Sequence, residues 1–206
     1  MFRKYEGSMN FFLVDASIHR RCVLMSNVQM FAEELKLVES KVSYPSGAKV
    51  ELGKEITPIE VKDEPTVTWE ADNDALYTLI MVDPDAPSRA EPTFREILHW
   101  LVVNIPGNKV TQGETIAAYI GSTPPQGTGL HRYIFLVFKQ AGKIDATNIT
   151  PKITIRESRR NANTRQFMAK YNLGEPIAGN FYQAQYDDYV DILRARQIKH
   201  NFFSVK

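Results

Sequence analysis

Two histidines, an aspartate and a tyrosine stand at the ends of three apolar, strand-like runs of this sequence. Asp83 ends the first run, His99 lies near the start of the second, and His131 and Tyr133 open the third. Residues at neighbouring strand ends lie within side-chain reach when they share one face of a sheet. Protonated imidazoles and a phenol can all donate hydrogen bonds. The four side chains therefore indicate a small site for an oxyanion such as phosphate or a carboxylate.

The loop before His131 has a composition that suits the same purpose. Residues 121–129 read GSTPPQGTG. Glycine lets the backbone approach a ligand closely, and Gly121, Gly127 and Gly129 are expected to turn amide groups inward as a nest for an oxyanion. The simpler interpretation is that a loop rich in glycine and proline only turns the chain.

The charge of Asp83 needs a partner if an anion is to bind beside it. Two unit charges about 4 Å apart interact by about 4 kcal/mol at an effective dielectric constant near 20. An ionised Asp83 would repel an anion on that scale. We therefore expect Asp83 to orient one imidazole and to favour its charged form. The alternative is that Asp83 accepts a hydrogen bond from an ammonium group or a protonated oxygen of the ligand.

Enzymatic and vestigial roles are the competing interpretations of these residues. Asp83, His99 and His131 could hold zinc or iron, but their spacing matches no metal motif, and we predict neither a metal nor another cofactor. Ser122 could serve as a hydrolase nucleophile, yet the sequence has no GxSxG-type elbow around it. A third alternative is a scaffold whose pocket is vestigial. Separately, a histidine in a strand is more often packed than functional.

Composition narrows the class of protein. The chain has 206 residues, 43% of them hydrophobic, and a formal net charge of +1. These values suit a single globular domain and give no reason to expect nucleic acid as a partner. A single cysteine argues against a disulfide framework and fits a reducing compartment. No apolar run approaches the ~20 residues of a membrane-spanning helix, and we predict a cytoplasmic, monomeric protein.

The first apolar run, from Leu76 to Asp83, must position the aspartate. Its residues are apolar on both faces, as in a strand that is buried on both sides near the centre of a sheet. Strand alternation places Asp83 on the face of Tyr77. Pro84 and Pro87 then remove backbone donors, so the chain has to leave the sheet directly after Asp83.

The remaining elements follow from periodicity and from turn residues. Strict alternation in the second run places His99 on one face with Leu101 and Val103, and Trp100 on the other. The expected strands are 41–44, 48–52, 66–69, 76–83, 97–104, 130–139 and 181–186, and the expected helices are 32–39, 163–172 and 187–197. The pattern predicts a mainly β domain over residues 41–200 with short helices, one of them C-terminal, after an extension of residues 1–40 and before a tail of residues 201–206.

A basic run leads into the second expected helix, residues 163–172. It consists of Arg156, Arg159, Arg160 and Arg165. Charge runs of this kind usually form the solvated face of a helix. Contact with a phosphate or peripheral contact with a membrane is the minority interpretation.

Two segments carry a resemblance to a known family. DPDAPSR (83–89) and GTGLHRY (127–133) resemble, in order and spacing, the signature segments of the phosphatidylethanolamine-binding protein family. The likeness extends through YPSG, ELGKEITP, HWLVVN and AGNFYQAQYDDYV and covers residues 41–200. It implies a fold of antiparallel β-sheets with short helices, and a cis Ala86–Pro87 bond.

The resemblance also implies a function without catalysis. Members of the family hold phosphate, acetate or a phospholipid head group in a small pocket, and they modulate signalling kinases or inhibit serine proteases through protein contacts. Phe94, Ile97, Thr123 and Arg194 depart from residues that are common in the family at these positions: tyrosine, tryptophan, glycine and tyrosine. The ligand-binding set that the resemblance implies is Asp83, Phe94, His99, Gly121, Ser122, Thr123, Pro124, His131, Tyr133 and Arg194.

Overall fold

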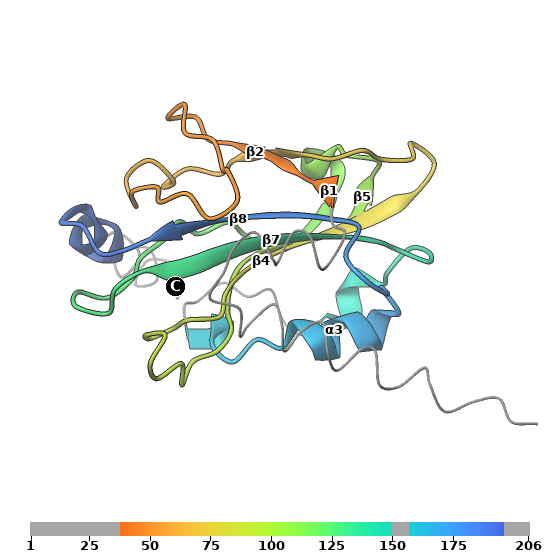
Figure 1. Cartoon of the computed structure of the whole chain (residues 1–206). Coiled ribbons are helices and arrows are strands. Elements are labelled where there is room, and N and C mark those ends of the chain that lie inside the picture. The colour runs from red at the N-terminus through yellow and green to blue at the C-terminus, as the bar shows by residue number, and fades with distance from the viewer. Residues whose placement is uncertain (1–37, 150–156, 196–206) are drawn as a thin grey trace, which may run out of the picture. The chain divides into compact units, whose positions relative to one another are not determined.

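A mixed sheet of six strands dominates the computed structural model, which describes residues 38–149 and 157–195. The strand order is β1-β8-β7-β4-β5-β6, and a second sheet holds β2 and β3 (Figure 1). All pairs are antiparallel except β1 with β8. The strands are β1 (Val38–Glu39), β2 (Lys41–Ser43), β3 (Thr66–Thr68), β4 (Leu76–Asp83), β5 (Ile97–Pro106), β6 (Glu114–Ala117), β7 (His131–Lys139) and β8 (Ala178–Ala184). The mainly β class predicted from the sequence is confirmed.

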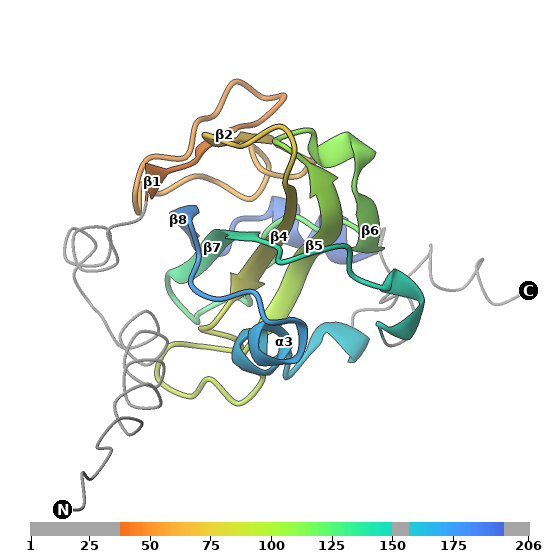
Figure 2. The same ribbon diagram turned by 90° about the vertical axis from the view of Figure 1, so that its right-hand side faces the viewer.

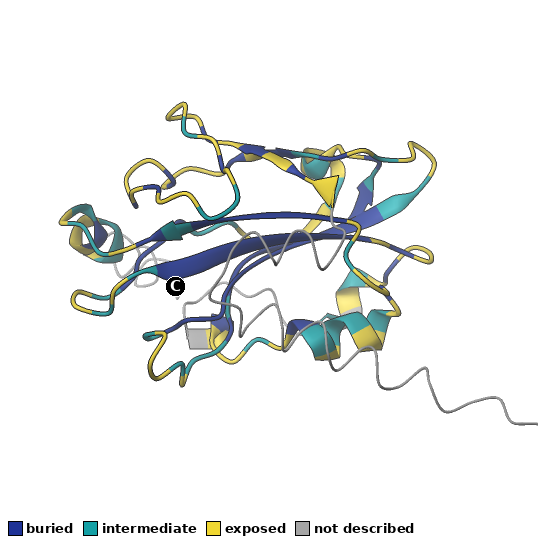
Figure 3. Ribbon diagram, viewed as in Figure 1, coloured by how far each residue is buried: buried dark blue, intermediate teal, exposed yellow. Residues whose placement is uncertain are grey.

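Strand β4 lies inside the sheet, as its apolar pattern predicts. It pairs with β7 on one side and with β5 on the other. Seven of its eight residues are buried, and only Leu76 is partly exposed. Asp83 ends the strand, and the Ala86–Pro87 bond that follows is cis, as expected. Figure 3 shows that exposure is concentrated in the loops around the buried central strands.

The main hydrophobic core lies between the two sheets. The β2–β3 sheet covers one face of the large sheet, and α3 (Thr164–Tyr171) lies on the other side (Figures 1 and 2). Val42 and Val67 of the small sheet belong to the same core cluster as Met81, Trp100 and Phe135 of the large one. The face of β4 that carries Asp83 is therefore the face toward the small sheet.

Several predicted elements differ from the structure at the edges. The expected strand 48–52 is reduced to one bridge between Ser43 and Lys49. Edge strands β1, of two residues, and β6, of four, were not predicted. The predicted helix 32–39 is wrong at Val38 and Glu39, which pair with β8, and its other residues lie outside the described ranges.

The C-terminal half of the chain matches the predicted helices more closely. Helix α3 begins after Asn163, whose side chain accepts a hydrogen bond from the amide of Gln166, and ends at Asn172 in a left-handed conformation. Residues 189–195 are helical, within the predicted range 187–197. No helix in the described part of the chain is both long and apolar enough to cross a membrane. Residues 1–37 and 196–206 lie outside it, so the predicted extension and tail stay predictions.

Candidate functional site

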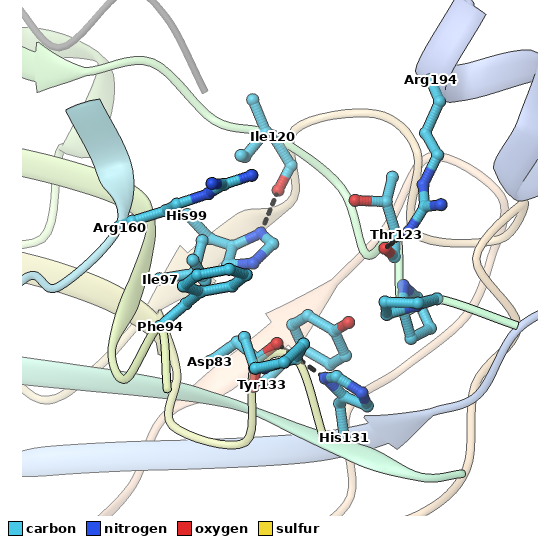
Figure 4. Close-up of a pocket in the computed structure, with 14 residues that line it drawn as sticks. Asp83, Phe94, Ile97, His99, Ile120, Thr123, His131, Tyr133, Arg160 and Arg194 are labelled. Atoms are coloured by element: carbon cyan, nitrogen blue, oxygen red, sulfur yellow. Dashed lines mark hydrogen bonds and ion pairs between the residues drawn. The ribbon is translucent and has the colours of Figure 1, made fainter. Parts of the chain in front are cut away.

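A cavity of about 270 Å³ opens at the end of β4 and at the starts of β5 and β7. Figure 4 shows Asp83, His131 and Tyr133 along one side of it, with Arg160 and Arg194 on either side. The lining combines charged and polar groups with an apolar wall: Asp83, Ala86, Pro87, Phe94, Ile97, His99, Ile120, Thr123, Pro124, Pro125, His131, Tyr133, Arg160 and Arg194.

His131 is held at both ring nitrogens. Its Nδ1 lies 2.9 Å from Oδ2 of Asp83, and its Nε2 lies 2.9 Å from the hydroxyl of Thr128. The Thr128 hydroxyl also donates to the carbonyl of Pro125 at 2.7 Å. A carboxylate can only accept, so Nδ1 donates to Asp83, and Asp83 fixes the orientation of the His131 ring. The charged form of this ring stays a prediction.

The Asp83 carboxylate is fixed by the loop that follows it. Its other oxygen, Oδ1, accepts a hydrogen bond of 2.7 Å from the backbone N–H of Asp85. Both oxygens are therefore engaged inside the protein, one by the turn and one by His131. Asp83 is 4% exposed, so this orientation is set by buried contacts and does not depend on a ligand.

Asp85 is not part of the cavity lining and holds the start of β7 through Arg132. The carboxylate accepts two side-chain hydrogen bonds from Arg132, at 2.9 and 2.6 Å, and one from the Arg132 backbone N–H at 2.9 Å. Arg89 adds a contact of 3.2 Å. Burial alone would raise the pKa of Asp85, but the hydrogen bonds and charge of Arg132 hold it below its usual value. Asp85 is thus an ionised structural residue.

A β-bulge brings His99 to the cavity. Met81 lies opposite Trp100 and Val82 lies opposite Leu98, so β5 holds one residue more than β4 between these pairs. Strict alternation, which placed His99 on the face away from Trp100, fails here because a bulge redirects a side chain. The His99 ring instead meets the Tyr133 ring edge-on, with centroids 5.1 Å apart.

His99 and Tyr133 present polar atoms of defined character. Nδ1 of His99 donates to the carbonyl of Ile120 at 2.9 Å, because a carbonyl can only accept. Tyr133 is 1% exposed and stacks on Tyr182 with centroids 5.1 Å apart. Burial, and then the charge of Asp83, raise the pKa of the Tyr133 hydroxyl well above its ordinary value. The hydroxyl therefore stays protonated at neutral pH.

Two adjacent arginines of the basic run differ in their surroundings: Arg159 is buried and Arg160 lines the cavity. Arg159 is 3% exposed and donates to the carbonyls of Leu98, His99 and Ala118 at 2.8–3.2 Å. Burial lowers its pKa to about 10, which leaves it charged at neutral pH. The prediction of a solvated helix face is wrong for Arg159, because its guanidinium supports the backbone at the bulge.

Arg160 lines the cavity and was not among the predicted site residues. Its guanidinium carbon lies 4.3 Å from the centre of the Phe94 ring, a cation–π distance. Only its place in the basic run hinted at this role. Arg194 lines the cavity as predicted, and it donates to the carbonyl of Thr123 at 3.0 Å.

Two predicted residues of the glycine-rich loop lie away from the cavity. Ser122 is fully buried, and its hydroxyl pairs with the Tyr182 hydroxyl at 2.5 Å. A side chain at Gly121 would lie 2.7 Å from the carbonyl oxygen of Val61. The loop lines the cavity with Thr123, Pro124 and Pro125, and prolines have no N–H. Pro124 and Pro125 therefore contribute no amide donors to the cavity, and the nest expected from the glycines stays a prediction.

Replacing Gly121 by alanine is expected to lower the free energy of unfolding by about 1–3 kcal/mol, the usual cost of overpacking. The added methyl group meets backbone of residues 61–62, which cannot give way as a side chain could. Urea denaturation measures the loss. Phosphate affinity of the folded variant should stay within about twofold of wild type. A tenfold weaker phosphate affinity in a fully folded variant would show that Gly121 belongs to the binding site.

The sequence comparisons place this chain among known proteins. A sequence model of the family described as phosphatidylethanolamine-binding protein matches residues 46–183. A Drosophila melanogaster protein that carries the name odorant-binding protein A5 is 39% identical over 150 residues, which are 73% of this chain and 71% of that protein. A 26 kDa secreted antigen of Toxocara canis is 44% identical over 144 residues, 70% of this chain but only 55% of the antigen.

Solved structures share the fold. The solution structure of CG7054 is 52% identical in sequence, with a TM-score of 0.64, and the match covers 77% of this chain and 90% of that one. A phosphatidylethanolamine-binding protein from Plasmodium vivax, at 22% identity, has a TM-score of 0.63 over 84% of this chain and 97% of its own. At that identity the likeness concerns the fold alone.

The relatives correct the predicted location. One is named as a secreted antigen and another as an odorant-binding protein. These names point to an extracellular protein, and the prediction of a cytoplasmic one is wrong. The single cysteine had suggested a reducing compartment. That inference failed because secreted proteins need disulfides chiefly when the domain is too small for a sufficient core. A sheet that is buried on both faces, as β4 is, needs none, so cysteine content does not discriminate between compartments here.

Proposed function

Since this chain belongs to the phosphatidylethanolamine-binding protein family, we propose that its cavity binds a small phosphate-bearing anion. The observation that carries the proposal is the pairing of His131 with Asp83 beneath two arginines. The His131 ring lies 2.9 Å from the Asp83 carboxylate at the edge of the cavity, so the carboxylate faces an imidazole N–H and not the anion. Arg160 and Arg194 then leave the lining with an excess of positive charge.

The polar lining offers donors of three kinds to such an anion. The guanidinium groups are always charged and suit phosphate geometry. The neutral Tyr133 hydroxyl supplies an O–H donor, and His99 lies against it. Hydrogen bonds between a charged group and an ionised partner are about twice as strong as neutral ones. A phosphate is therefore favoured over an uncharged ligand of the same size.

Binding, and not hydrolysis, is the activity that we assign to this cavity. Ser122, the loop hydroxyl considered as a nucleophile, is fully buried against Tyr182. The Asp83 carboxylate already accepts hydrogen bonds at both oxygens, so a metal would have to compete with internal partners. The resemblance also implies a kinase or serine-protease partner and a phosphatidylethanolamine-like head group. Both stay predictions.

Replacing His131 by alanine is expected to weaken the binding of inorganic phosphate about 10- to 100-fold. Both ring nitrogens of His131 are engaged by Asp83 and Thr128, so the loss is expected because the variant leaves the Asp83 carboxylate without its imidazole partner beside the anion. Tenfold corresponds to about 1.4 kcal/mol. Asp83→Asn is expected to weaken binding as well, because the carboxylate no longer stabilises the imidazolium. Histidine NMR during a phosphate titration at pH 7.5 measures both effects.

The wild-type titration provides the reference. The signals of His99 and His131 should both shift with phosphate. Circular dichroism should show that both variants are folded. Unchanged phosphate affinity in His131→Ala and Asp83→Asn together would overturn the proposal.

A further inference from the structure

Two arginines from separate elements flank the cavity. Arg160 follows the short helix η3 (Glu157–Arg159), and Arg194 belongs to the helical segment 189–195. In Figure 4 the two side chains enter from opposite sides of the site, above His131, Asp83 and Tyr133. An anion seated on the floor of the cavity therefore has a guanidinium on each side.

The acceptors that an ammonium group would need are already engaged. Among the described residues Asp83 is the one carboxylate in the lining, and its two oxygens accept hydrogen bonds from the Asp85 amide and from His131. An aromatic face is the other common partner for an ammonium group. Phe94 lies in the wall of the cavity, but the Arg160 guanidinium lies over its ring at 4.3 Å. A second cation at this ring would meet the positive charge of Arg160.

We propose that this cavity selects dianionic phosphomonoesters without a neighbouring ammonium group, and that Arg160 and Arg194 determine this specificity. The inference rests on the proposed function and adds the ligand class to it. A phosphomonoester carries a charge of about −1.5 to −2 at pH 7, which matches two guanidinium groups. A phosphodiester carries one negative charge, and phosphoethanolamine brings a cation toward the arginines.

The apolar part of the wall indicates what the phosphate is attached to. Ala86, Pro87, Ile97, Ile120 and Pro125 share the lining with the charged groups. Apolar surface of this kind favours a hydrocarbon substituent next to the phosphate. The chemical class is thus a phosphate monoester of an alcohol with an apolar chain, either as a free small molecule or as the head of a lipid such as phosphatidic acid.

Three probes that differ by one feature test the specificity. They are ethyl phosphate, O-phosphoethanolamine, which adds an ammonium group, and diethyl phosphate, which has a single charge. Isothermal titration calorimetry at pH 7.5 should give ethyl phosphate an affinity about tenfold or more above each of the other two. Tenfold corresponds to about 1.4 kcal/mol, which two guanidinium contacts can supply.

Charge-removing variants assign the specificity to the two arginines. In Arg160→Gln and Arg194→Gln the preference for ethyl phosphate over O-phosphoethanolamine should fall to about threefold or less, and in the double variant it should vanish. Arg194→Lys, which keeps the charge, should retain most of the preference. Lys109→Gln is the matched control, because it removes an exposed cation at the opposite end of β5 from the cavity and should leave the preference unchanged.

The outcomes separate this inference from the proposed function. Equal affinity of wild type for ethyl phosphate and O-phosphoethanolamine would overturn the inference while phosphate binding stands. No binding of any of the probes, or of phosphate, would overturn the proposed function. Co-sedimentation with phosphatidylcholine vesicles that contain phosphatidic acid separates the two sources of the ligand. If the protein binds these vesicles and ethyl phosphate displaces it, the ligand is a lipid head group. If the protein binds ethyl phosphate but not the vesicles, the ligand is a free monoester.

Discussion

Replacing Asp85 by alanine is expected to lower the free energy of unfolding by about 3–5 kcal/mol, the cost of breaking a buried ion pair by removing one partner. Asp85 is fully buried and Arg132 is 9% exposed. Without the carboxylate, the Arg132 guanidinium loses two hydrogen bonds, and its backbone N–H loses a third. A whole domain is stable by only about 5–15 kcal/mol, so urea denaturation at pH 7 should show a large shift of the midpoint.

The pH dependence of this loss follows from the lowered pKa of Asp85. A carboxyl group whose pKa is depressed by folding stabilises the folded state above its unfolded pKa, which is about 3.9 for aspartate. That stabilisation disappears as the pH falls through the lower, folded pKa. The difference in unfolding free energy between wild type and Asp85→Ala should therefore narrow as the pH is lowered below about 4. A difference that stays constant from pH 7 to pH 2.5 would contradict the assignment.

Asp83 provides the matched control for Asp85, two residues away in the same DPDAP segment. Its carboxylate is also buried, but its side-chain partner is the imidazole of His131 and not a guanidinium. Asp83→Asn keeps an acceptor oxygen for the amide of Asp85, so the variant should retain most of the stability and lose phosphate affinity. The opposite pattern, with Asp83 essential for stability and Asp85 for binding, would reverse the roles that we give to the two carboxylates.

Replacing Arg159 by leucine is expected to cost about 3 kcal/mol of unfolding free energy. The guanidinium donates to main-chain carbonyls of Leu98, His99 and Ala118, and it is 3% exposed. Each hydrogen bond to a charged group contributes about 1.5–3 kcal/mol, and such contributions are not additive. Because two of the three carbonyls lie at the bulge, the NMR signals of His99 should also move in the variant without any ligand.

Arg160→Leu is the control for that experiment. Arg160 is exposed, and surface substitutions usually change stability by less than about 0.5 kcal/mol. Thermal or urea denaturation should thus separate two adjacent arginines of the same run. Equal losses of stability in both variants would show that Arg159 has no special part in supporting β5.

The relation between prediction and structure differs from one part of the site to the next. Asp83, His131 and Tyr133 could be placed from sequence because β4 and β7 pair without interruption along this stretch, so a period of two holds to the strand ends. His99 was also predicted for the site, but strict alternation gave it the wrong face, because the bulge in β5 adds one residue and turns its side chain. Nothing local in HWLVVN marks that bulge, which is set by pairing with β4.

The glycines of the loop 121–129 illustrate a second limit. They mark a turn, as the simpler interpretation had it, and Gly127 and Gly129 have positive φ. Glycine is needed at position 121 for another reason: the backbone at Val61, sixty residues earlier in the chain, lies too close for a side chain. A sequence indicates that a glycine is needed, but whether a ligand or another strand requires it depends on packing.

By itself, the sequence determined the mainly β class, the central strand 76–83 with its terminal carboxylate, and the place of His131 and Tyr133 at the start of a neighbouring strand. These features depend on local periodicity, on proline at the strand end and on two motifs that are each contiguous in the chain. Only the tertiary structure decided which arginine of the basic run is buried and which faces the cavity, which of two nearby aspartates supports the fold, and that Ser122 turns away. Those outcomes depend on contacts between residues tens of positions apart, and local patterns carry no information about them.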